Sequence, residues 1–136
     1  MRIVVLGSSG LIGNTITKFF LNQSKYETFG FVRDLEKISI FEKKYHKNFI
    51  YMNNILDFEE FEKILIKSKP KLIINCLGIT NKLLKNNFQS IERSLKINAL
   101  FPHKLHTICT KIDARLIHLS TDCVFSGRRG FYKEDD

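Results

Sequence analysis

The 136-residue sequence has little of what marks several special classes of protein. Its three cysteines, Cys76, Cys109 and Cys123, form no Cys-x-x-C pair, which favours reduced thiols in a cytoplasmic protein over a disulfide framework or a zinc site. Its apolar runs, such as residues 3–6, are far shorter than the ~20 residues of a membrane-spanning helix, and its first residues do not resemble a signal peptide. We therefore expect a cytoplasmic protein with no membrane partner.

Acidic residues are outnumbered, because 14 Asp and Glu against 22 Lys and Arg give a net charge of +8. A positive field favours anionic partners. The basic residues are scattered, however, and no zinc finger, bZIP region or basic strand with interleaved aromatics is present, so we expect no nucleic-acid partner. His103, His106 and His118 have no acidic partner at ligand spacing, and we expect no metal site.

Short apolar runs alternate with amphipathic stretches along the chain, which is typical of βαβ units and a parallel sheet. Right-handed crossovers then favour a Rossmann-type, doubly wound α/β fold with strand order 3-2-1-4-5. No repeat or linker divides the chain, so residues 1–136 are expected to form one domain. The predicted strands are residues 2–6, 28–32, 48–52, 71–77 and 115–119, and the predicted helices are residues 11–22, 35–45, 58–69 and 89–111.

The predicted helices are expected to bury one apolar face each. Asp57 and Glu60 have the spacing of a capping box. Pro102 is expected to kink or split the helix over residues 89–111. The expected buried positions of the first helix are Leu11, Ile12, Thr15, Ile16, Phe19 and Phe20, and those of the last are Ile91, Leu95, Leu105, Ile108 and Ile112.

Three glycines follow the first predicted strand and open the first helix, in the pattern G-x-x-G-x-x-G. Gly7 permits the tight turn, Gly10 lets a pyrophosphate approach the backbone, and Gly13 lets the helix pack closely on the strand. The helix N-terminus would then offer free N–H groups to the phosphates. The loop therefore predicts dinucleotide binding.

Arg33 stands at the end of the second predicted strand, about 20 residues after Gly13, where a ribose-reading residue is expected. An arginine at this place pairs with a 2′-phosphate, whereas an acidic residue accepts from a ribose 2′-hydroxyl. Arg33 thus favours NADP, and the adjacent Asp34 leaves NAD open.

Later motifs add a family resemblance. The glycine loop, residues 75–78 (Asn-Cys-Leu-Gly), Asn98 and residues 120–127 (Ser-Thr-Asp-Cys-Val-Phe-Ser-Gly) occur in order and with family spacing. Together they resemble the extended short-chain dehydrogenase/reductase superfamily. The Ser-Thr-Asp-x-Val-Phe-x-Gly signature and residues 130–136 after it resemble the dTDP-4-dehydrorhamnose reductase branch of NAD(P)-dependent sugar-nucleotide reductases.

The resemblance assigns roles to particular residues. Thr121 would be catalytic, its hydroxyl donating to the substrate carbonyl oxygen. Asn54 stands where the family usually has Asp, and Cys123 where Tyr is frequent. Asn98 matches a helix asparagine of the proton-relay region, although an amide that satisfies a helix irregularity is the alternative. The implied cofactor-binding residues are Gly7, Ser8, Ser9, Gly10, Leu11, Ile12, Gly13, Arg33, Asn54, Ile55, Cys76, Leu77, Gly78, Asn98 and Ser120, and the implied substrate-binding residues are Asp122, Cys123, Val124 and Phe125.

One part of the family's chemistry is missing from the sequence. A Tyr-x-x-x-Lys pair normally donates the proton, and none of the four tyrosines here has Lys four residues later. We therefore expect the N-terminal part of a reductase of a 4-keto-6-deoxy sugar nucleotide, involved in making cell-surface polysaccharide precursors, and inactive as this chain. A sugar-nucleotide substrate and a homodimer of the full-length protein are the expected partners. A sugar-nucleotide epimerase or dehydratase, or a non-catalytic NADP-binding subunit, is the alternative.

Overall fold

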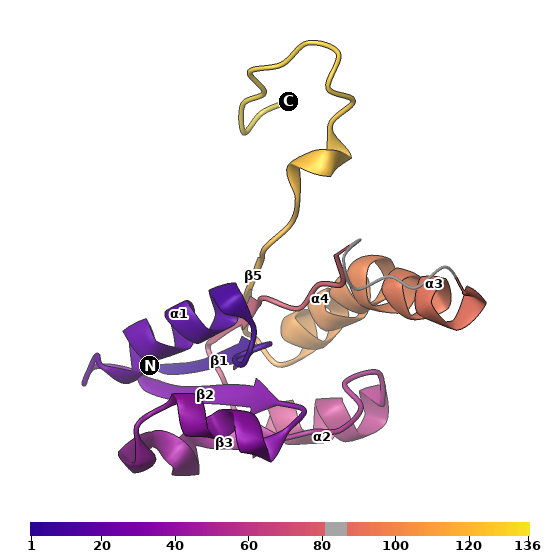
Figure 1. Cartoon of the computed structure of the whole chain (residues 1–136). Coiled ribbons are helices and arrows are strands. Elements are labelled where there is room, and N and C mark those ends of the chain that lie inside the picture. Colours follow the sequence, from indigo (N-terminus) through magenta and orange to yellow (C-terminus); the bar gives the residue numbers. More distant parts are fainter. Residues whose placement is uncertain (81–86) are drawn as a thin grey trace.

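The computed structural model describes residues 1–80 and 87–136. In this part of the chain, five strands form one parallel sheet in the order β3-β2-β1-β4-β5 (Figure 1). The doubly wound α/β fold and the strand order predicted from the sequence are thereby confirmed. The strands are β1 (Arg2–Leu6), β2 (Glu27–Val32), β3 (Phe49–Tyr51), β4 (Leu72–Asn75) and β5 (Arg115–His118).

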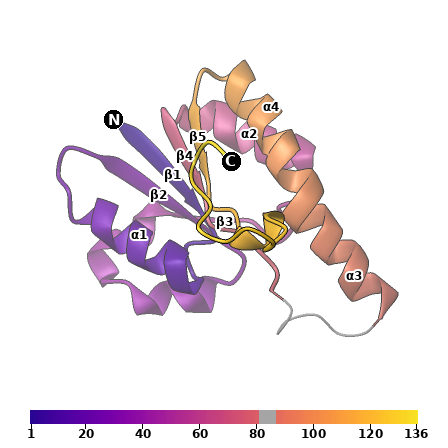
Figure 2. The same cartoon turned by 90° about the horizontal axis from the view of Figure 1, so that it is seen from above.

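Helices cover both faces of the sheet (Figure 2). Alternate residues of a strand point to opposite faces, so β1 supplies Ile3 and Val5 to one cluster and Val4 and Leu6 to the other. Helix α1 (Leu11–Leu21) covers the first cluster. The second and larger cluster lies under α2 (Phe58–Ser68) and α4 (Phe101–Lys111). No helix within the described residues has the length and apolar character needed to cross a membrane.

Small residues and part of the expected apolar stripe form the contact of α1 with the sheet, since Ile16 and Phe20 pack against the first cluster as predicted. Gly13 and Thr17 are the buried positions of this helix. The expectation for Leu11, Ile12, Thr15 and Phe19 is wrong, since all four are exposed, Leu11 by 90%. The helix lies so close to the turn after β1 that a Cβ on Gly13 would collide with the Gly7 carbonyl oxygen. At this point of contact there is no space for any side chain.

The connection from β2 to β3 departs from the predicted helix over residues 35–45. It contains two 3-10 helices, η1 (Leu35–Ile40) and η2 (Lys43–Asn48). Phe41 separates them with an extended backbone, and its buried ring lies 4.4 Å from that of Phe49. Burying this ring between the two segments is incompatible with one continuous helix, which explains the wrong prediction.

The predicted helix over residues 89–111 contains a wide turn. Helix α3 (Phe88–Leu95) passes through a π-helical turn, η4 (Lys96–Leu100), into α4. Phe101 N–H donates to the carbonyl oxygen of Lys96, five residues back. Pro102 follows in the first turn of α4, where its missing N–H costs little. The irregularity expected at the proline therefore lies just before it.

The burial along this helix changes at the wide turn. Leu105 and Ile108 are buried as predicted, but Leu95 is 62% exposed and Ile91 is also exposed, so the expectation for these two is wrong. In α2, the Asp57 carboxylate accepts from Glu60 N–H at 3.1 Å, as the capping box predicts. The reciprocal bond of the box is replaced, because Asp57 N–H donates to the carbonyl oxygen of Asn54.

The contact of α1 with the turn after β1 gives a stability prediction. Gly13→Ala should lower the free energy of unfolding by about 1–3 kcal/mol or more, because the added methyl group meets backbone that cannot move aside. Gly78→Ala is the matched control, since its Cβ would find its nearest neighbour 3.9 Å away. Urea unfolding of both variants measures the difference. Equal midpoints for the two variants would show that the contact is not tight.

Candidate functional site

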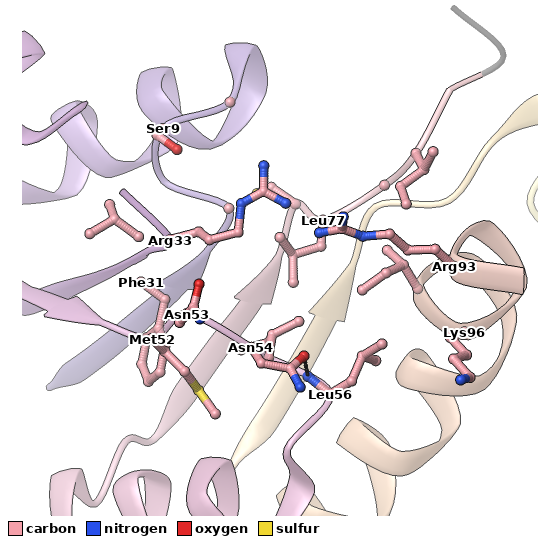
Figure 3. Close-up of a pocket in the computed structure, with 18 of the residues that line it drawn as sticks. Ser9, Phe31, Arg33, Met52, Asn53, Asn54, Leu56, Leu77, Arg93 and Lys96 are labelled. Atoms are coloured by element: carbon pink, nitrogen blue, oxygen red, sulfur yellow. Dashed lines mark hydrogen bonds between the residues drawn. The ribbon is translucent and has the colours of Figure 1, made fainter. Parts of the chain in front are cut away.

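A cavity of about 750 Å³ lies at the carboxyl ends of the strands (Figure 3). Its walls come from the segments that follow β1, β2, β3 and β4, and from one side of α3 and η4. In open α/β sheets, ligands bind in the crevice outside the carboxyl ends of the strands, where the strand order reverses. Here the order reverses between β1 and β4, and the cavity lies at that place.

The glycine loop closes the cavity on the side of α1. Gly7 has φ +76°, a conformation that favours glycine, and its carbonyl oxygen accepts from Gly10 N–H at 2.9 Å. Ser8 is buried beneath the loop, with its hydroxyl donating to the carbonyl oxygen of Val5. Ser9 and Gly10 line the cavity together with Gly7.

The N-terminus of α1 offers a positive end beside this loop. Gly10 is the N-cap, no side chain caps the helix, and its first turn holds no acidic residue. The first N–H groups of a helix have no partner within the helix, and the helix dipole is positive at this end. Such an end favours an anion such as a phosphate.

Asn75 holds the wall formed after β4. Its side chain is completely buried, and its Oδ1 accepts from Leu77 N–H at 3.1 Å. Its Nδ2 donates to Nδ1 of His118 at 3.0 Å, so the imidazole is neutral at that nitrogen. Burial lowers the pKa of His118 below its ordinary value of 6.5, in agreement with this arrangement. The amide thus ties the start of the wall to β5.

Cys76, Leu77 and Gly78 line the cavity along this wall. Burial raises the pKa of the Cys76 thiol to about 11, so the protonated thiol predominates at neutral pH. A thiol is a poor nucleophile compared with its thiolate. Cys76 therefore serves the site as a wall residue.

Asn98 fixes the next part of the same wall from the π-helical turn. Its Oδ1 accepts from Ile79 N–H at 2.8 Å, and its Nδ2 donates to the carbonyl oxygen of Ile79, also at 2.8 Å. Ile79 lines the cavity, but Asn98 does not. The amide thus satisfies both backbone groups of one residue and holds η4 against the segment after β4.

The segment after β2 brings one positive charge to the cavity. Arg33 lines the wall, whereas the Asp34 carboxylate accepts from Glu36 N–H at 2.9 Å and caps η1. After β3, Asn54 and Ile55 also line the cavity. The Asn54 Oδ1 accepts from Leu56 N–H at 3.1 Å, which fixes the turn of the backbone there.

The structure does not bring the predicted catalytic segment to the cavity. Residues 120–126 are exposed, and the chain after β5 leads away from the sheet (Figure 1). Thr121 caps the short helix η5 (Asp122–Val124), its Oγ1 accepting from Cys123 N–H at 3.2 Å. Further along, the Phe125 ring stacks on Tyr132 at 4.4 Å. Ser120 and residues 122–125 thus stand apart from the cavity walls.

Nine of the residues predicted for the cofactor line the cavity and six do not. Ser8 and Gly13 lie beneath the loop, Leu11 and Ile12 face solvent, and Asn98 and Ser120 lie outside the walls. Sequence reasoning missed the side of α3, because helix periodicity gives a face but not the direction it points in. The nine lining residues are Gly7, Ser9, Gly10, Arg33, Asn54, Ile55, Cys76, Leu77 and Gly78, and the missed ones include Met52, Asn53, Leu56, Glu92, Arg93 and Lys96.

A doubly wound parallel sheet with a glycine loop between β1 and α1 defines a Rossmann-type domain of the short-chain dehydrogenase/reductase class. The chain belongs to the RmlD substrate binding domain family, which matches residues 1–136.

Relatives and solved structures agree with this membership. The chain is 28% identical over 137 residues to the "Probable low-salt glycan biosynthesis reductase Agl14" of Haloferax volcanii, covering 100% of the chain and 42% of that relative. It is 26% identical to "Methionine adenosyltransferase 2 subunit beta" of Bos taurus, covering 99% and 36%. A hypothetical dTDP-4-dehydrorhamnose reductase from Sulfolobus tokodaii superposes with a TM-score of 0.75 at 27% identity, covering 100% and 45%. The chain thus spans less than half the length of each.

The two hydrogen bonds between the Asn98 amide and the backbone of Ile79 predict that removing this amide lowers the stability of the fold. Asn98→Ala should lower the free energy of unfolding by about 0.5–1.5 kcal/mol, because it removes both hydrogen bonds to the backbone of Ile79 at an exposed position. Asn53→Ala removes an amide from another exposed position and should change stability by less than about 0.5 kcal/mol. Urea unfolding, with hydrogen exchange at Ile79, measures both. Similar losses in the two variants would contradict the role of Asn98.

The contact between Asn75 and His118 predicts a pH dependence of stability. The pKa of His118 is lower in the folded chain than its ordinary value, so the unfolded chain binds the proton more readily. This contribution to stability is complete above about pH 6.5 and is lost as the pH falls through the lowered folded-state pKa. The free energy of unfolding should therefore fall with acid more steeply for the wild type than for His118→Gln. His103→Gln, which removes an imidazole from an exposed position, is the comparison variant. Parallel slopes for all three would refute the assignment.

Proposed function

We propose that residues 1–136 form the nicotinamide-dinucleotide-binding domain of a reductase that acts on a 4-keto-6-deoxy sugar nucleotide. The observation that carries this proposal is the glycine loop and uncapped α1 N-terminus beside a cavity at the switch point of the sheet. Family membership and the glycan-biosynthesis reductase of Haloferax volcanii support the reductase class and its role in making polysaccharide precursors.

The residues present suit a dinucleotide. The backbone of Ser9 and Gly10 with the first turn of α1 would receive the pyrophosphate. The wall at Asn54 and Ile55 would face the adenine, and the backbone at residues 76–78 would lie along the path to the nicotinamide. A cavity of about 750 Å³ is within the range that small-molecule cofactors occupy.

We propose NADP as the preferred cofactor. Arg33 lines the cavity with a guanidinium that only donates hydrogen bonds and therefore suits a 2′-phosphate. The Asp34 carboxylate, which would favour the ribose diol of NAD, is used as the cap of η1. These two observations favour NADP over NAD.

In the reductase, a reduced nicotinamide held at this site would supply the hydride for the substrate carbonyl carbon. Thr121 would donate its hydroxyl proton in a hydrogen bond to the carbonyl oxygen, and residues 122–125 would contact the sugar nucleotide. The 136 residues contain no Tyr-x-x-x-Lys pair. We therefore propose that this chain binds the cofactor and that turnover belongs to the full-length protein.

A negative charge introduced at position 9 tests the proposed dinucleotide binding. Ser9→Glu places a carboxylate beside the expected pyrophosphate and should weaken NADP and NAD binding at least about tenfold. Ser9→Gln is the control, because it has nearly the same size without the charge. Isothermal titration of the chain measures both. Failure of the wild-type chain to bind either nucleotide, or equal affinities for the two variants, would contradict the proposal.

A non-catalytic nucleotide-binding subunit is the second candidate, favoured by the 26% identity to a methionine adenosyltransferase subunit. NADPH oxidation by the full-length protein with dTDP-4-keto-6-deoxyhexose separates the two. Turnover supports the reductase, and nucleotide binding without turnover of related keto-sugars supports the subunit. Conversion of a sugar nucleotide without net NADPH consumption would indicate an epimerase or dehydratase instead.

A further inference from the structure

Positive charge gathers around the cavity from separate elements. Four charged residues line it within the described part of the chain, three basic (Arg33, Arg93 and Lys96) and one acidic (Glu92). Arg33 follows β2, whereas Arg93 lies on α3, about 60 residues further along the chain. Figure 3 shows the side chains of Arg33 and Arg93 extending toward one another across the cavity.

The carboxylates beside these arginines are engaged elsewhere. Glu92 pairs with Lys96 at 2.7 Å, and Asp34 accepts from Glu36 N–H at 2.9 Å. Among the residues that the structure describes, neither Arg33 nor Arg93 forms an ion pair. Two guanidinium groups thus line a common space, and neither is paired with a carboxylate of the described residues. Such a pair is electrostatically unfavourable alone and becomes favourable around an anion.

The position of Arg93 is set by contacts at both ends of α3. Asn87 caps the helix, its Oδ1 accepting from Ser90 N–H at 2.9 Å. At the other end, Asn98 holds η4 to the wall through both backbone groups of Ile79. Gln89, Arg93 and Ile97 are four residues apart and all line the cavity, so this face of the helix is directed into it.

We propose that Arg93 is a second specificity-determining arginine, which binds the terminal 2′-phosphate of an NADP-type nucleotide from the wall opposite Arg33. This assignment rests on the proposed dinucleotide site. A phosphate monoester carries a charge of about −1.5 to −2 and three acceptor oxygens, enough for two guanidinium groups. The pyrophosphate already has the α1 N-terminus, on the other side of the cavity.

Two small nucleotides isolate this contact. Adenosine 2′,5′-bisphosphate carries the 2′-phosphate without pyrophosphate or nicotinamide, and AMP lacks only the 2′-phosphate. Arg93→Ala should weaken binding of the bisphosphate about tenfold to a hundredfold, because this is the contribution expected of charge-assisted hydrogen bonds. The same variant should change AMP binding less than about twofold. Arg93→Lys should retain part of the preference. Arg115→Ala removes an exposed arginine of β5 outside the cavity and should change neither affinity.

The outcomes separate this assignment from the proposed function. If Arg93→Ala weakens both nucleotides equally, Arg93 contacts the adenosine and the assignment is wrong. It is also wrong if Arg93→Ala binds both like the wild type, or if the wild type binds the two nucleotides equally. In each of these cases the dinucleotide site is tested separately, by whether the wild-type chain binds NADP or NAD. If the wild-type chain binds neither, the proposed function itself is wrong. Because Arg93 is exposed, its variants should keep the wild-type urea midpoint.

Discussion

The contact between α1 and the turn after β1 is the constraint on which the other features of this domain depend. Gly13 lies against the Gly7 carbonyl oxygen with no space for a Cβ, and this proximity puts the start of α1 at the edge of the sheet. A helix held further away would move its N-terminus away from the cavity, which Gly10 lines. Thr17 is buried on the same side of α1 as Gly13, whereas Phe19 is exposed on another side of the helix.

Two asparagines fix the backbone of the opposite wall, as the close contact of Gly7 and Gly13 fixes the glycine loop. Asn75 joins the backbone after β4 to His118, and Asn98 joins it to the π-helical turn. Parallel strands end their ladders at the carboxyl edge, where backbone groups need other partners. Short amides satisfy these groups without filling the cavity, so the wall is fixed while the space beside it stays open. The site thus combines a fixed backbone with charged side chains, Arg33 and Arg93, at its walls.

Much of the fold could be predicted from the sequence, because strands buried on both faces are continuous apolar runs and the glycine loop has a fixed place after the first one. The spacing from the glycine loop placed Arg33 at the site, and the family resemblance placed residues 76–78 there. Sequence reasoning failed where tertiary contacts override periodicity. Burial of the Phe41 ring divides the segment after β2, and Leu11 lies on the side of α1 opposite Gly13 and the sheet. Arg93 could not be assigned, since its relation to Arg33 exists only after the sheet has formed.

The π-helical turn shifts the periodicity with which side chains point around the axis of one long helix. A turn that closes five residues back holds roughly one residue more than an α-helical turn, which corresponds to about 100° of rotation around the axis. Residues before and after it therefore follow two different periodic patterns, although the backbone is continuous. The part after the turn directs Leu105 and Ile108 into the core, and the part before it is free to direct Arg93 into the cavity. Deletion of one residue between 96 and 100 would give the whole helix a single α-helical periodicity. With Leu105 and Ile108 still in the core, Arg93 would then point away from the cavity.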